Sequence, residues 1–133
     1  MSVTAPLGFR AAGVVAGLKT SGERDVAVVI NDGPSRAAAA VFTSNRVQAA
    51  PVTWSRQVTS GGRVRAVVLN SGGANACTGP LGFQDTHATA EHLALALLGL
   101  AQAGSPQDAP GAADTALILG RAATAGPTHG GTA

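Results

Sequence analysis

The sequence predicts a layered α/β (α+β) fold, on three observations made along its 133 residues. A strand candidate at Val64–Asn70, with apolar residues on both faces from Ala66 to Leu69, is typical of a buried strand. It stops in a loop of small and polar residues, Asn70–Gly79, and an amphipathic helical pattern follows from Asp85. Strand, loop and helix in this order form an α/β element, and the length allows one domain with one core.

Small side chains dominate the apolar content of the chain. Apolar residues make up 45% of it, but aromatic residues only 3%, with a single tryptophan, Trp54. Because alanine and valine bury little area each, the core that they form is thin. We therefore expect the chain to need a partner surface or further polypeptide, and otherwise to aggregate.

Charge and cysteine content exclude several classes of protein. The formal net charge is +2, and the arginines are scattered singly without interleaved aromatic residues, which disfavours nucleic-acid binding. The single Cys77 excludes an internal disulfide framework and a multi-cysteine metal site. The first residues lack the pattern of a secretory signal, and no apolar run reaches the roughly 18 residues of a membrane span. We expect a cytoplasmic protein with neither a membrane nor a nucleic acid as partner.

The N-terminal third predicts extended chain and a hairpin. Glycines recur at near-regular spacing in residues 1–22, which indicates extended chain punctuated by turns. Val26–Ile30 is a strand candidate, and Asn31–Pro34 is a dense turn signal. Because Ala37–Thr43 follows as a second strand candidate, the two are expected to form an antiparallel pair.

The middle of the chain predicts a short helix and a central strand. Residues 45–60 are ambiguous: Pro51 removes a backbone donor, and Val52–Val58 can start a short helix that the following pair of glycines ends. Val64–Asn70 then carries apolar residues on both faces, which predicts a strand in the middle of a sheet.

A longer helix and a tail of low complexity complete the predicted elements. Asp85 is expected to be the helix N-cap, and Gly99 or Gly104 to supply the C-terminal stop. Residues 101–133 are rich in alanine, glycine and proline and are expected to be linker-like or disordered, with Thr115–Leu119 as one strand-like island. The apolar positions of the helix fall at spacings of three and four: Ala90, Leu93, Ala94, Leu97 and Leu98.

The candidate reactive groups have structural interpretations that are favoured over catalytic ones. The loop Asn70–Gly79 lacks the glycine and lysine pattern of a phosphate-binding loop, so a tight connection is favoured over an anion cradle. Cys77 is expected to be a small buried hydrophobe, in preference to a nucleophile with His87 or His92 as its base. His87 and Glu91 are expected to form a solvated helical pair.

The carboxylates give no acid–base pair either. They are spread singly, and Asp32 and Asp85 occupy positions where turns and helix caps use aspartate. The residues themselves therefore assign no catalytic, substrate-binding or metal-binding side chain.

Four segments of the chain together carry a family resemblance. They are Val3–Gly13, Ala27–Pro34, Ala40–Val47 with Ala49–Pro51, and Arg63–Gly79 continuing into Gly82–Glu91. These segments resemble the N-terminal part of the ornithine acetyltransferase family, the bifunctional glutamate N-acetyltransferases of arginine biosynthesis. The resemblance covers about residues 3–98 in order, and its one departure in the loop is Gly73, where the family often has asparagine.

The resemblance implies an αββα-type acetyltransferase fold, of which residues 1–100 form an incomplete N-terminal portion and residues 101–133 a divergent tail. Family members transfer acetyl from N-acetylornithine to glutamate through an acetyl-enzyme. Some also take acetyl-CoA as a co-substrate, and no other cofactor is implied. The nucleophile is an N-terminal threonine, which self-cleavage before the threonine of an Ala-Thr-Met-Leu motif exposes, and its α-amine serves as the base. The two cleaved chains assemble as an α/β heterotetramer.

The catalytic residues that the resemblance implies are not found in this sequence. Met1 is the only methionine, so Ala-Thr-Met-Leu does not occur. The resemblance also implies an oxyanion hole made by a Thr-Gly pair of a Ser-Thr-Gly-type motif that lies well after the helix. Thr78-Gly79 has the same two letters, but its position matches an earlier family segment, and after Gly99 no strand bearing the true pair aligns. We therefore expect a chain truncated before its catalytic residues and inactive alone. The alternatives are a non-enzymatic module that binds a partner subunit or a small anion through Asn70–Gly79, and a non-functional gene product.

Overall fold

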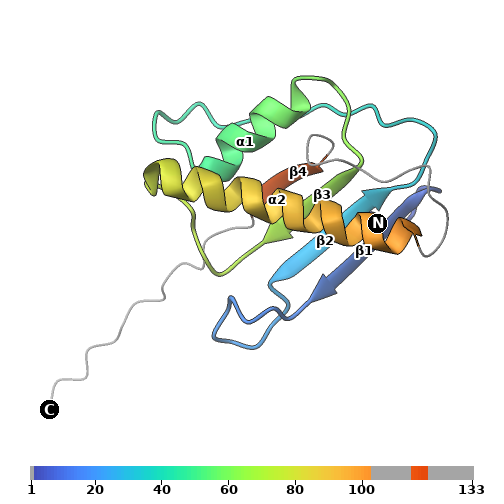
Figure 1. Ribbon diagram of the computed structural model, residues 1–133, viewed down its shortest axis with the longest axis horizontal. Helices are drawn as coiled ribbons and strands as arrows, with labels where there is room; N and C mark the ends of the chain where they lie inside the picture. Colours follow the sequence, from blue (N-terminus) through green and yellow to red (C-terminus); the bar gives the residue numbers. More distant parts are fainter. Residues whose placement is uncertain (1, 103–114, 120–133) are drawn as a thin grey trace, which may run out of the picture.

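A computed structural model describes residues 2–102 and 115–119 of the chain. Their helices and strands alternate along the sequence, which gives the mixed helix-and-strand fold that was expected (Figure 1). The elements are β1 (Phe9–Val14), β2 (Val26–Asn31), α1 (Ala50–Thr59), β3 (Ala66–Asn70), α2 (Gly79–Gln102) and β4 (Thr115–Leu119).

The four strands form one mixed sheet in the order β1-β2-β3-β4. β2 pairs antiparallel with both β1 and β3, and β3 pairs parallel with β4. Val68 of β3 thus lies opposite Val28 on one side and Leu117 on the other. The prediction that β3 is a central strand is confirmed, because it has a hydrogen-bonded neighbour along each edge.

Both helices lie on the same face of the sheet (Figure 1), and α1 contacts α2 and β4. The segment that the sequence left ambiguous contains a helix, α1. Pro51 lies in its first turn, where the missing backbone N–H costs no hydrogen bond. Trp54 is the one large aromatic side chain at the centre of the packing, with Val68 and Ala90. Partly buried side chains surround this cluster: Val26, Val28, Val58, Phe83 and Leu93.

The face of α2 that meets the sheet consists mostly of small side chains. Ala90 and Ala94 are buried as predicted, together with Leu97, whereas Leu98 is 36% exposed and does not belong to this face. Thr86 continues the buried stripe one turn earlier, with 1% exposure. Small residues at these positions allow the helix axis to approach the sheet closely.

The opposite face of the sheet has no helix over it among the described residues (Figure 1). Side chains alternate between the faces of a strand, so Ala27 and Val29 of β2 point away from the helices, as do Val67 and Leu69 of β3. These four side chains are half-buried, and Ala27, Val29 and Leu69 line an open, mainly apolar hollow of about 440 Å³ together with residues of β1.

The predicted strand at residues 37–43 is wrong. Ala37 forms one isolated antiparallel bridge with Arg63, and the chain then continues without regular structure. The predicted hairpin partner of β2 is therefore also wrong, because β1 and β3 occupy both edges of β2. Val41 is 99% exposed, so the alanine-rich segment buries too little apolar area to compete for a place in the sheet.

The predicted ends of the long helix are also wrong. α2 begins at Gly79, six residues before the expected N-cap Asp85, and it continues past Gly99 to Gln102. Gly104 and most of the expected linker-like tail lie outside the described residues, but the strand-like island Thr115–Leu119 is confirmed as β4. Within residues 2–102, no helix combines the length and apolar character needed to cross a membrane.

Candidate functional site

The loop that marks the family resemblance leaves the carboxyl end of β3 and runs directly into α2. Because β4 is parallel to β3, with Asn70 opposite Leu119, the carboxyl ends of both strands lie at the same end of the sheet. Such an end is where open α/β sheets place their ligands. Asn70 itself carries a buried side-chain oxygen that has no hydrogen-bond partner within the described residues.

Asn75 ties the loop to the first turns of both helices. Its side-chain amide donates to the carbonyl of Gly82 at 2.6 Å and to the hydroxyl of Thr86 at 3.0 Å. The hydroxyl of Thr78 donates to the side-chain oxygen of Asn75, and the backbone N–H of Ala50 donates to the Asn75 carbonyl at 3.1 Å. The polar groups of the loop are thus engaged with each other and with α2, which is why the helix begins at Gly79 and not at Asp85.

Two glycines of α2 provide a matched test of this network. A Cβ at Gly82 would overlap the side chains of Thr78 and Asn75, whereas one at Gly99 would meet nothing within 4 Å. We expect Gly82→Ala to lower the free energy of unfolding by about 1–2 kcal/mol, because displacing the network outweighs the better helix propensity of alanine. Gly99→Ala is expected to raise it by roughly 0.5–1 kcal/mol.

Urea unfolding followed by circular dichroism measures both changes. Equal stabilisation by the two substitutions would contradict a structural role for the Asn75 network.

The beginning of the loop packs against the segment that joins β1 to β2. Gly72 has a φ of +105°, and a Cβ there would lie 2.8 Å from the carbonyl oxygen of Leu18. The next glycine, Gly73, has no atom within 4 Å of the corresponding position. The close approach that the loop requires is therefore at Gly72, and the family departure at Gly73 falls where the structure leaves open space.

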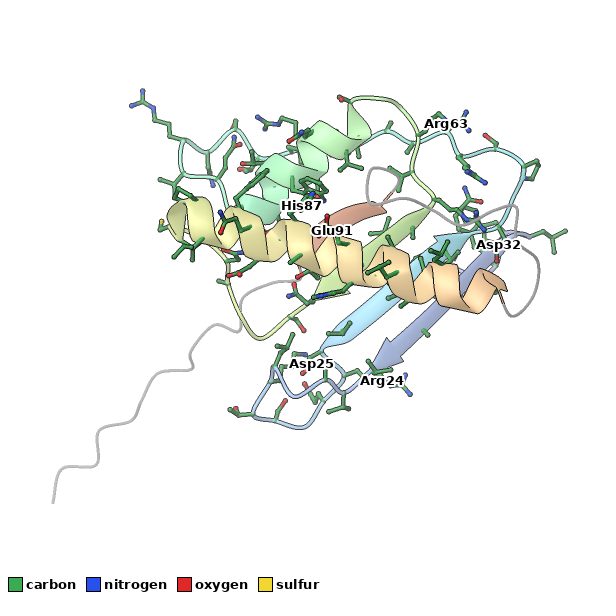
Figure 2. All side chains as sticks on the ribbon, in the orientation of Figure 1. Arg24, Asp25, Asp32, Arg63, His87 and Glu91 are labelled. Carbon is green, nitrogen blue, oxygen red and sulfur yellow. The ribbon has the colours of Figure 1, made fainter. Side chains whose placement is uncertain are left out.

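Asp25 fixes the segment on which Gly72 rests. Its carboxylate is 3% exposed and accepts backbone N–H groups from Ala16 at 2.6 Å, Leu18 at 2.5 Å and Lys19 at 3.0 Å. The hydrogen bond from Ala16 is the main cause that holds the pKa of Asp25 below its ordinary value, and those from Lys19 and Leu18 add to it, while burial opposes them. Figure 2 shows Asp25 at the base of this segment, beside Arg24.

The carbonyl of Asp25 also accepts the N–H of Ser71 at 2.8 Å, so one residue joins both segments. Sequence reasoning missed Asp25 because its three donors come from a turn six to nine residues earlier. The available signal was an aspartate directly before a strand and after a glycine-punctuated segment.

Cys77 is not the buried hydrophobe that was expected. It is exposed, and its φ of 58° makes it the one non-glycine residue with a positive φ among the described residues. The turn that this conformation creates leads the chain into α2, where Gly79 also has a positive φ. The side chain of Cys77 is exposed because the loop turns at this residue. It contacts neither a base nor a charged group in the described part of the chain.

His87 and Glu91 form the helical pair that was expected, with Nδ1 and Oε1 3.5 Å apart and both side chains partly exposed on α2 (Figure 2). The His87 ring also meets Trp54 edge-on, with the ring centroids 4.7 Å apart. This contact gives the imidazole a packing role at the joint between the two helices. His92 is exposed on the same helix, and no group of three metal-ligating side chains occurs among residues 2–102 and 115–119.

The model of the ArgJ family matches residues 10–119 of the chain. The bifunctional arginine-biosynthesis protein ArgJ of Thermobifida fusca is 76% identical over 97 residues, which are 73% of this chain and 25% of that protein. The ArgJ protein of Mycobacterium tuberculosis H37Rv is 70% identical over 95 residues, or 71% of this chain and 24% of that protein. The chain thus spans about a quarter of the length of these relatives.

Solved structures agree with the sequence comparisons. The ornithine acetyltransferase of Mycobacterium tuberculosis, crystallised with ornithine, superposes with a TM-score of 0.80 at 57% identity, covering 93% of this chain and 60% of that one. The ArgJ protein of Bacillus halodurans superposes with a TM-score of 0.73 at 31% identity, covering 90% and 56%. The family match reaches Leu119, so the expectation that the resemblance ends near residue 98 is wrong.

Proposed function

This chain belongs to the ArgJ family, and on that premise we propose that residues 10–119 are the N-terminal scaffold of an acetyltransferase of arginine biosynthesis. The observation that carries the proposal is the 76% identity over 97 residues to the Thermobifida fusca relative. The substrates proposed for the whole enzyme are N-acetylornithine as acetyl donor and glutamate as acceptor, with acetyl-CoA as a further donor.

The acyl-transfer centre is proposed to lie at the carboxyl ends of β3 and β4. In the family that the chain resembles, a strand after the helix matched by α2 bears the oxyanion pair. β4 is the strand in that position, and its parallel pairing with β3 supports a site beside Asn70 and Ser71. Donors at such a strand end would stabilise the oxyanion of the tetrahedral intermediate.

The 133 residues are proposed not to transfer acetyl by themselves. The sequence contains no Ser-Thr-Gly after α2 and no Ala-Thr-Met-Leu. Residues 10–119 therefore supply the frame of the site, while the nucleophile and oxyanion donors come from elsewhere in an active enzyme.

The half-exposed apolar face of the sheet supports an assembly role for this frame. Ala27, Val29, Val67 and Leu69 form a surface that a second layer of structure would bury. We propose that the remainder of the family fold, in the same or another chain, packs against this face, as the αββα arrangement requires.

Two assays test the proposal together. The purified chain, free of host enzyme, is expected to give no acetyl transfer from N-acetylornithine to glutamate. A chimera in which its 97 matching residues replace those of the Thermobifida fusca relative is expected to self-cleave and to retain activity within about tenfold of the parent, because most surface differences have small effects.

The two assays fail in different ways. Turnover by the chain alone would refute its proposed dependence on residues from elsewhere. A folded chimera without self-cleavage would refute the scaffold role, and a Gly82→Ala chimera serves as the internal control in which the frame of the site is deliberately distorted.

A further inference from the structure

A second polar site lies at the other end of β3, away from the strand-end loop. Asp32 follows β2 directly and Arg65 precedes β3 directly, so antiparallel pairing brings them to the same edge. Arg63 lies one short step earlier in the chain, and Figure 2 shows it at the same end of the sheet as Asp32. The residues around them enclose a mainly polar hollow of about 510 Å³.

The charges that line this hollow are unbalanced. Arg63 and Arg65 contribute guanidinium groups, and Asp32 is the only carboxylate among the described lining residues. Arg36 also lines the hollow, but it has an interaction partner of its own. Such an excess of fixed positive charge in a concave surface attracts anions. The volume lies within the range that holds a small metabolite.

Asp32 forms ion pairs with both Arg10 and Arg65, but its hydrogen bonds go to Arg10. Arg10 donates from Nε to one carboxylate oxygen and from Nη2 to the other at 3.2 Å, a bidentate pair. This contact is the main reason that the pKa of Asp32 lies below its ordinary value, so the carboxylate stays ionised and committed to Arg10. Arg65 Nη2 is 3.8 Å from the nearer oxygen, beyond a direct hydrogen bond.

Arg65 is left with a buried donor that nothing in the described chain satisfies. Its side chain is 13% exposed, and its Nη1 is buried without a hydrogen-bond partner within the described residues. An unpaired donor on a buried charged group is costly, and native structures rarely retain one without a ligand or water in its place. The planar fork of a guanidinium matches the oxygens of a phosphate or a carboxylate.

We propose that this hollow binds a small oxyanion, the phosphate or carboxylate group of a metabolite, through Arg65, with Arg63 at its rim. The site is separate from the proposed acyl-transfer edge, since it lies at the amino end of β3 and the loop Ser71–Gly79 leaves the carboxyl end. A ligand here would bind to the scaffold without entering the reaction.

Thermal unfolding of the full chain tests the site, with inorganic phosphate and succinate as separate probes at an ionic strength held constant with sodium chloride. At least one probe is expected to raise Tm saturably, by about 5 °C or more at a hundredfold excess over its Kd. The probe that acts identifies the source of the oxyanion as phosphate or carboxylate. No saturable rise with either probe would overturn the proposal.

Three variants locate the binding. Arg65→Met keeps the apolar stem, removes the guanidinium, and is expected to raise the Kd at least tenfold. Arg63→Ser, at an exposed position, is expected to weaken binding about threefold to tenfold and remains informative if Arg65→Met fails to fold. Arg24→Ser removes the same charge near Asp25, far along the sheet in Figure 2, and is expected to leave the Kd unchanged. Equal Kd values for the wild type and Arg63→Ser, or weaker binding by Arg24→Ser, would also overturn the proposal.

Discussion

Gly72→Val is expected to lower the free energy of unfolding by about 3 kcal/mol, because two costs coincide at this position. A β-branched side chain is disfavoured at the positive φ of Gly72, and its Cβ would lie 2.8 Å from a backbone carbonyl oxygen that cannot rotate away. The segment carrying Leu18 is itself held by Asp25, so it does not yield easily. The loop at the carboxyl end of β3 is then displaced from its support.

Gly73→Val is the matched control for this prediction. Its Cβ would meet no atom within 4 Å, and the expected change is within about 0.5 kcal/mol. Urea midpoints at constant m-value measure both variants. If the two substitutions destabilise the chain equally, the cost comes from valine in a loop in general, and the specific contact with Leu18 is excluded as its cause.

Asp25→Asn is expected to be strongly destabilising at neutral pH, with a fall in Tm of roughly 10 °C. The carboxylate accepts three backbone N–H groups, and an amide in the same place offers one acceptor oxygen and directs an NH₂ group at donors. The residues between β1 and β2 are then expected to become sensitive to protease, since their amides lose their common acceptor.

The pH dependence of this effect follows from the direction of the pKa shift. The pKa of Asp25 is lowered in the folded chain from its ordinary 3.8, first by the Ala16 N–H and then by those of Lys19 and Leu18. Folding thus favours the ionised form, so the contribution to stability is fully present above about pH 4 and is lost as the pH falls through the lower folded value. The difference in Tm between wild type and Asp25→Asn should therefore narrow below pH 4.

Asp85→Asn provides the control, since Asp85 is exposed on α2. Its difference from the wild type should stay small at every pH. A gap between wild type and Asp25→Asn that is constant from pH 7 to pH 3 would show that the ionised carboxylate is not what holds the segment.

The main elements could be predicted because their signals are local. The apolar run that ends at Asn70 predicts β3 and its central place, and the spacing of Ala90, Ala94 and Leu97 predicts the buried face of α2. The family was also recognisable from sequence, since the segments that carry the resemblance are contiguous. Side-chain periodicity and short motifs are properties of neighbouring residues, so they need no knowledge of the fold.

Pairing and helix ends depended on distant partners, and there the prediction failed. Ala37–Thr43 has the composition of a strand, but both edges of β2 are occupied by β1 and β3. Asp85 has the character of an N-cap, but Asn75 and Thr78 support the helix six residues earlier. At residues 37–43, pairing with distant strands overrides the local strand preference. At α2, hydrogen bonds within the preceding loop and the first helical turn move the start of the helix.

The sequence by itself determined the family, the apolar strand at the centre of the sheet and the long helix that packs on it. Only the tertiary structure decided that the Asp25 carboxylate accepts three backbone N–H groups beside the strand-end loop. It also decided that Gly72, and not Gly73, makes the close contact with Leu18, and that Arg65 has a buried N–H group without a partner at the other end of β3. The physical reason is that hydrogen-bond acceptors, close packing and charge balance are set by groups that meet across the sheet, and sequence separation does not record which groups meet.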